Sequence, residues 1–118
     1  MPILTILVED LPEGAPHLAI QTKRGYEDGE GLRFSVPYEL RADRSGVIQP
    51  IGDAVQKQPD GRRFVYLAWL SGGGMVGRIK VQFDELPAEQ LAEGASVVVS
   101  ATDRRGKPAG GTVAFRVV

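Results

Sequence analysis

The glycine-rich segment SGGGMVGRIK, residues 71–80, is the first place to look for chemistry, because Gly72, Gly74 and Gly77 match the pattern GxGxxG. In dinucleotide-binding sites these glycines follow a strand and open a helix whose N-terminus faces the pyrophosphate. Here the residues after Gly77 alternate between polar and apolar types, which predicts a strand in place of that helix. No Lys-Ser or Lys-Thr pair follows the glycines, so the phosphate-loop pattern also fails. We therefore expect Gly72, Gly73 and Gly74 to form a mobile hairpin loop that binds no nucleotide.

A second candidate for chemistry is a group of cations around this loop. Arg62 and Arg63 precede the apolar run 64–70, and Arg78 and Lys80 lie in the alternating run 76–84. If the two runs form adjacent antiparallel strands, these cations converge and form a candidate site for an anion. The alternative is a charged solvent face that protects an exposed strand from aggregation.

The register of this hairpin decides which aromatic ring accompanies the cations. The run FVYLAWL is apolar on both of its alternating sets, so two registers remain open. In one, Trp69 faces the core and Tyr66 lies opposite Lys80. In the other, Tyr66 faces the core and Trp69 lies among the cations. The candidate ligand-binding residues are Arg62, Arg63, Tyr66, Trp69, Arg78 and Lys80.

The remaining residues that could do chemistry do not form a recognisable catalytic pattern. His17 is the only histidine, and we expect it in a half-exposed loop. The carboxylates form two groups without the spacing of a calcium loop, and we expect both to be solvated: Glu9, Asp10 and Glu13, and Glu27, Asp28 and Glu30. We assign no catalytic residue, no metal ligand and no cofactor.

Alternating patterns show which elements must position these side chains. Leu32, Phe34, Val36, Tyr38 and Leu40 alternate with polar residues or proline, which predicts a strand with one buried face. Pro37 within it has no N–H group to donate, so we expect an edge or a bulge there. Ile79, Val81 and Phe83 form a second alternating set with the same meaning.

Further strands are expected over 3–8, 18–22, 97–101 and 113–118, the last two forming a C-terminal hairpin. One short helix is expected within DELPAEQLAEG, residues 84–94, where Pro87 suits a first turn and Gly94 an end. The fold class we predict is all-β, an antiparallel β-sandwich or partly open barrel of about seven or eight strands with one short helix. An α+β fold is the alternative.

Composition limits the class of protein. The chain has 118 residues, which suits a single domain over 1–118, and its 42% hydrophobic and 25% charged residues are ordinary globular values. A net charge of -1 lacks the basic surplus of proteins that bind nucleic acid. There is no cysteine, and the apolar run at the N-terminus is too short for a membrane span and lacks the basic start of a secretory signal. We expect a soluble cytoplasmic protein that binds neither nucleic acid nor membrane.

The block IGDAVQKQPDGRRFVYLAWLSGGGMVGRIKVQFDEL, residues 51–86, resembles a bacterial domain-of-unknown-function family of small single-domain proteins. The motifs behind the resemblance are GDAVQ, then PDGRRFVYL, then RIKV. The family has no known activity, so the resemblance implies an uncharacterised domain and no catalytic residue.

Three functions therefore stand beside one another. The favoured hypothesis is a non-enzymatic binding module for a protein or a small anionic ligand, since no catalytic motif is intact. The second is a small hydrolase or isomerase that uses carboxylates with Arg62, Arg63 or Arg78. The third is a structural homodimer built on an open sheet edge.

Overall fold

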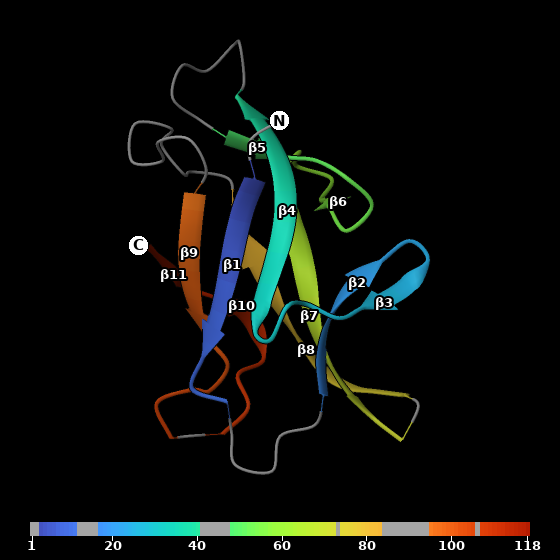
Figure 1. Cartoon of the computed structure of the whole chain (residues 1–118), viewed down its shortest axis with the longest axis vertical. Coiled ribbons are helices and arrows are strands. Elements are labelled where there is room, and N and C mark those ends of the chain that lie inside the picture. The colour runs from blue at the N-terminus through green and yellow to red at the C-terminus, as the bar shows by residue number, and fades with distance from the viewer. Residues whose placement is uncertain (1–2, 12–16, 41–47, 73, 84–94, 106) are drawn as a thin grey trace.

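A computed structural model describes residues 3–11, 17–40, 48–72, 74–83, 95–105 and 107–118, and it confirms an all-β fold (Figure 1). The described residues form eleven strands and no helix. The strands are β1 (Ile3–Glu9), β2 (His17–Thr22), β3 (Gly25–Glu27), β4 (Arg33–Leu40), β5 (Ile48–Pro50), β6 (Gln56–Lys57), β7 (Arg63–Ser71), β8 (Gly74–Gln82), β9 (Ala95–Ser100), β10 (Gly111–Val113) and β11 (Phe115–Val117). The helix expected over 84–94 lies outside the described residues.

The strands form two sheets that lie in front of one another in Figure 1. One sheet has the order β11-β9-β1-β4-β5, and the other has the order β10-β8-β7-β2-β3, with β6 also paired to β7. The expectation of a wholly antiparallel architecture is wrong, because β1 pairs with β9 and β8 pairs with β10 in parallel. The estimate of strand number was low because short strands such as β6 and β10 are too brief to leave an alternating pattern.

The core lies between the two sheets and draws on both. On β1 every second residue is buried, and on β4 Phe34, Val36 and Tyr38 are buried as the alternation predicted. Leu32 departs from the prediction: its side chain is 37% exposed, because β4 begins only at Arg33. The side chain of Leu40 is outside the described part. The second sheet contributes Leu18, Ile20, Val65, Leu67, Trp69, Ile79, Val81 and Phe83 to the same cluster.

Pro37 lies inside the first sheet, and the expectation of an edge or bulge is wrong in that form. β4 is flanked by β1 and β5, and its pairing with β1 shows no register shift at Pro37. The Pro37 carbonyl accepts a hydrogen bond from the backbone of Ile51, on the side of β5. Its missing N–H group points to that same side, where the ladder pairs only from Tyr38 onward. The proline therefore weakens the end of one ladder and leaves the other intact.

The C-terminal strands join the two sheets. The predicted pairing of 97–101 with 113–118 is present, as β9 pairs with β11. Before β11, however, β10 pairs with β8 in the other sheet, and only Ala114 separates the two strands. A single residue thus carries the chain from one layer to the other. Among the described residues, no helix is long and apolar enough to cross a membrane.

Candidate anion-binding surface

The hairpin of β7 and β8 is present as predicted, and its register is the one that places Trp69 in the core. Tyr66 lies opposite Lys80, and Val65 and Leu67 lie opposite Val81 and Ile79. The strands meet at Ser71 and Gly74, and Gly72 in the turn has a φ of 59°, a conformation that glycine adopts without strain. The turn itself is thus confirmed, whereas its mobility remains a prediction.

The hydrogen-bond pattern of this ladder brings the outer side chains close together. The backbone N–H of Phe83 donates to the carbonyl of Arg63, which makes that pair and every second pair after it the hydrogen-bonded ones. The pairs between them, including Tyr66 with Lys80, are not hydrogen-bonded to each other and have the shorter Cα separation. These are the pairs whose side chains lie on the outside of the sheet.

Two cations lie over two aromatic rings on that outside. The guanidinium carbon of Arg78 is 3.9 Å from the centroid of the Tyr66 ring, and Nζ of Lys80 is 4.3 Å from that of Phe64. The two rings meet edge to face, with centroids 5.0 Å apart. Because Arg78 lies opposite the small residue Ala68, it has room to lean one step along β7 onto Tyr66. Lys80 leans by the same step, so both cations keep the spacing of the strand.

The charges of these cations are not neutralised by the residues around them. Nζ of Lys80 donates to Oε1 of Gln58 at 2.8 Å, which is a neutral partner. Within the described part of the chain, neither Arg78 nor Lys80 forms an ion pair. Arg78 is exposed and Lys80 is half-buried. We call Gln58, Phe64, Tyr66, Arg78 and Lys80 together the outer face.

The other three candidate residues do not join this surface. Arg62 pairs with Asp60 at 3.6 Å in the turn before β7. Arg63 points to the opposite side of the sheet, where its guanidinium donates to the carbonyl of Pro50 at 2.9 Å and faces the amide of Gln49. Trp69 is buried in the core.

Two members of the outer face escaped the sequence analysis. Phe64 shares the parity of Tyr66 on β7, so the correct register would have identified it. Gln58 lies outside the hairpin, and it reaches Lys80 because β6 and the turn after it fold against the start of β7, where the backbone N–H of Gln58 donates to the carbonyl of Arg62. No local sequence pattern announces that approach.

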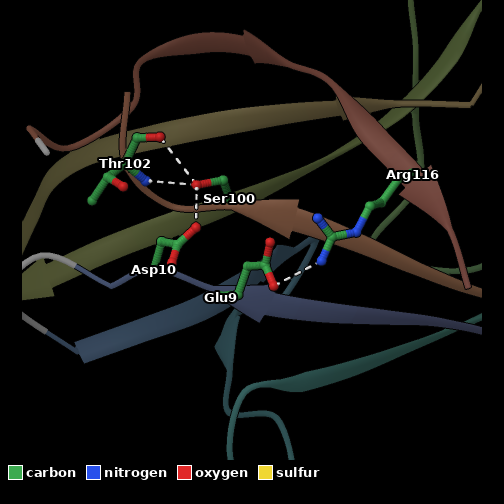
Figure 2. A network of polar contacts seen from close by, with 5 residues as sticks. All are labelled: Glu9, Asp10, Ser100, Thr102 and Arg116. Atoms are coloured by element: carbon green, nitrogen blue, oxygen red, sulfur yellow. Dashed lines mark hydrogen bonds and ion pairs between the residues drawn. The ribbon is translucent and has the colours of Figure 1, made fainter. Parts of the chain in front are cut away.

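A second polar cluster lies at the ends of the parallel strands β1 and β9 (Figure 2). The carboxylate of Glu9 accepts a hydrogen bond from Arg116 at 3.0 Å, and Ser100 Oγ donates to Asp10 at 3.3 Å. Ser100 Oγ also lies within hydrogen-bond distance of the carbonyl and the N–H of Thr102. These contacts fasten β1, β9 and β11 to one another, which is a structural role.

The remaining chemical candidates are accounted for by local contacts. His17 begins β2 and its Nε2 contacts the carboxylate of Asp28, with both side chains exposed. Glu27 lies 3.9 Å from Arg24 in the β2–β3 hairpin, and Glu13 is outside the described residues. No group of three or more histidine, cysteine, aspartate or glutamate residues in the described ranges is placed to hold a metal ion.

Comparison with known families supports the resemblance seen in the sequence. A family described as a family of unknown function, DUF5990, matches residues 3–116, which is nearly the whole chain. Comparison with curated proteins and with solved structures gave no match. The chain therefore belongs to the DUF5990 family, whose function is unknown.

Proposed function

We propose that this chain is a non-enzymatic binding module that recognises a carboxylate or phosphate group on the outer face. The observation that carries the proposal is the pair of cations, Arg78 and Lys80, each held over an aromatic ring and each without a carboxylate partner in the described part of the chain. Cations on a purely protective surface have no need of fixed positions.

The stacking supports recognition because it fixes donors in place before a ligand arrives. The Tyr66 ring covers one side of the Arg78 guanidinium, which leaves the N–H groups at the rim of that plane free for a bidentate contact with an anion. Lys80 gives one N–H to Gln58 and keeps two further donors. The two residues lie two positions apart on one strand face, about 7 Å.

The hydrolase or isomerase hypothesis has less support at this surface. It requires a carboxylate beside the arginines to exchange protons, and the contacts of Arg78 and Lys80 include none. Gln58 cannot take that role, because an amide does not titrate in the relevant range. We further propose a reducing compartment, the bacterial cytoplasm, as the location, since the chain contains no cysteine for a disulfide.

The test is a titration of the protein with inorganic phosphate and, separately, with succinate, followed by the NMR shifts of the Arg78 Nε–H and the Lys80 amide. We expect saturable shifts, and roughly tenfold weaker binding by the double variant Arg78→Gln/Lys80→Gln, since a charged hydrogen bond contributes about 1.5 to 3 kcal/mol. The matched control is Arg104→Gln/Lys107→Gln, which removes the same charge from the exposed loop after β9.

Two results would contradict the proposal. One is the absence of saturation by either anion up to about 10 mM, a concentration at which even a weak site is occupied. The other is an equal loss of affinity in the control variant, which would show that net charge alone attracts the anion.

A further inference from the structure

The strand that carries Arg78 has an open edge next to it. On one side β8 pairs with β7 along its length, whereas on the other side β10 pairs only with Ile79, Lys80 and Val81. No described strand covers Gly74–Arg78 on that side. The chain before β10 turns away, because the backbone N–H of Ala109 donates to the carbonyl of Ala101. In Figure 1 the free part of β8 runs to the hairpin tip at the lower right.

Main-chain groups along this edge face outward. Since Phe83 directs its N–H to β7, alternation directs the N–H and C=O groups of Lys80 and Arg78 to the opposite side. An open row of this kind is the template on which extended peptides add as a further strand. A strand added here would lie in line with β10 and continue the sheet beyond Gly111.

The side chains along the edge specify what such a strand should carry. A residue placed directly opposite Arg78 shares its side of the sheet, so a carboxylate there would meet the guanidinium. Toward the hairpin tip, Met75 is 44% exposed and lies opposite Leu70, on the same side as Tyr66 and Arg78. The edge thus offers one cation and one flexible apolar side chain to the same face of a ligand.

From these observations we propose that the ligand of the outer face is an extended acidic segment of another protein, which adds to β8 as a strand along Gly74–Arg78. This inference rests on the proposed anion site and names its ligand class. A second copy of the chain fits the edge less well, because β8 contains no aspartate or glutamate to meet Arg78. The shift in register between Trp69 and Leu70 also twists the edge, which disfavours pairing of two flat identical edges.

The probe is a fluorescein-labelled peptide of alternating valine and glutamate, long enough to span Gly74–Arg78, with binding followed by fluorescence anisotropy. Two isomers of the peptide carry N-methyl groups either on all glutamates or on all valines. In an added strand only alternate N–H groups face β8. We therefore expect one isomer to lose binding and the other to keep it; loss with methylated glutamates indicates an antiparallel strand, and loss with methylated valines a parallel one.

Variants of the protein separate this inference from the proposed anion site. Arg78→Gln should weaken the peptide and inorganic phosphate alike, by roughly tenfold. Met75→Ser should weaken the peptide several-fold and leave phosphate unchanged, because phosphate has no apolar contact to lose. The matched control is Leu11→Ser, another exposed apolar residue, which should change neither.

The outcomes against the inference are distinct. If both methylated isomers bind as well as the parent peptide, or if the peptide does not bind while phosphate does, strand addition is wrong and the anion site stands. If neither the peptide nor phosphate responds to Arg78→Gln, both proposals fall. If light scattering shows a dimer that the peptide does not dissociate and that blocks its binding, the edge belongs to a second copy of the chain.

Discussion

Arg78 stacks on Tyr66 although the residue opposite Tyr66 in the ladder is Lys80. The diagonal contact exists because Arg78 itself lies opposite Ala68, whose methyl group leaves the space beside it open. The aromatic ring therefore orients a guanidinium that its direct neighbour could not hold. That relationship converts an ordinary alternating strand into a surface with fixed donors.

The double variant Arg78→Ala/Lys80→Ala should leave folding nearly intact. Each cation–ring contact on an exposed surface contributes about 0.5 to 1 kcal/mol, so the combined loss in the free energy of unfolding should stay within about 2 kcal/mol. Urea denaturation measures this value, with Arg104→Ala/Lys107→Ala as the control for charge. A loss above about 3 kcal/mol would show that the cations are structural partners and would remove the motive for a binding surface.

Gly77→Ala should destabilise the protein through Trp69. A Cβ at this position would lie 3.0 Å from Cε3 of Trp69, inside van der Waals contact, so the indole or the strand must shift. Overpacking of this kind costs about 1 to 3 kcal/mol. The emission of Trp69, the only tryptophan, should change with the variant. The control is Gly74→Ala on the same strand, where a Cβ meets nothing within 4 Å and stability should be kept or raised.

Phe34→Ala should cost about 3 to 5 kcal/mol of unfolding free energy, because the ring is only 2% exposed and its removal leaves a cavity between the sheets. Thermal and urea unfolding both measure the loss. Leu32→Ala provides the contrast, since this neighbour precedes β4 and is largely outside the core. Similar losses in the two variants would mean that Leu32 is packed as the alternation alone predicted.

Asp10 should tolerate glycine better than alanine. Its φ of 56° is in the left-handed region, which costs a residue with a Cβ about 1 to 2 kcal/mol. Both substitutions remove the acceptor of the Ser100 hydroxyl, so the difference between them reports the backbone alone. We expect Asp10→Gly to be more stable than Asp10→Ala by about 1 kcal/mol after the greater chain entropy of glycine is counted. Equal stabilities, measured by urea denaturation, would mean that the turn relaxes.

The sequence was sufficient to predict the β7–β8 hairpin and insufficient to predict its register, for a physical reason. Both alternating sets of β7 are apolar, and in the structure both are largely buried: Phe64 and Ala68 on the outer side have little more exposure than Val65 and Leu67 in the core. Hydrophobicity therefore could not distinguish the two faces. The closing turn and the shift between Trp69 and Leu70 decide the register, and these depend on backbone geometry.

The partners of the strands were harder to infer than the strands themselves. Alternation identifies a buried face but not the neighbour, and β1 lies beside β9 in parallel although most of the chain separates them. The same holds for the candidate site, where Tyr66, Arg78 and Lys80 belong to one hairpin and were found, whereas Gln58 arrives through β6 and was missed.

The single-residue step at Ala114 has a consequence for how the protein folds. The strands on either side of it complete different sheets, and one of them pairs with β9, which in turn holds β1. The central strand of the first sheet is therefore without its parallel partner until residues near the opposite end of the sequence arrive. Structures built on such distant pairings fold over milliseconds to seconds, much more slowly than helical bundles. During synthesis, the hydrophobic side of β1 must wait for nearly the whole chain, and a chaperone that shields it in that interval would raise the yield of folded protein.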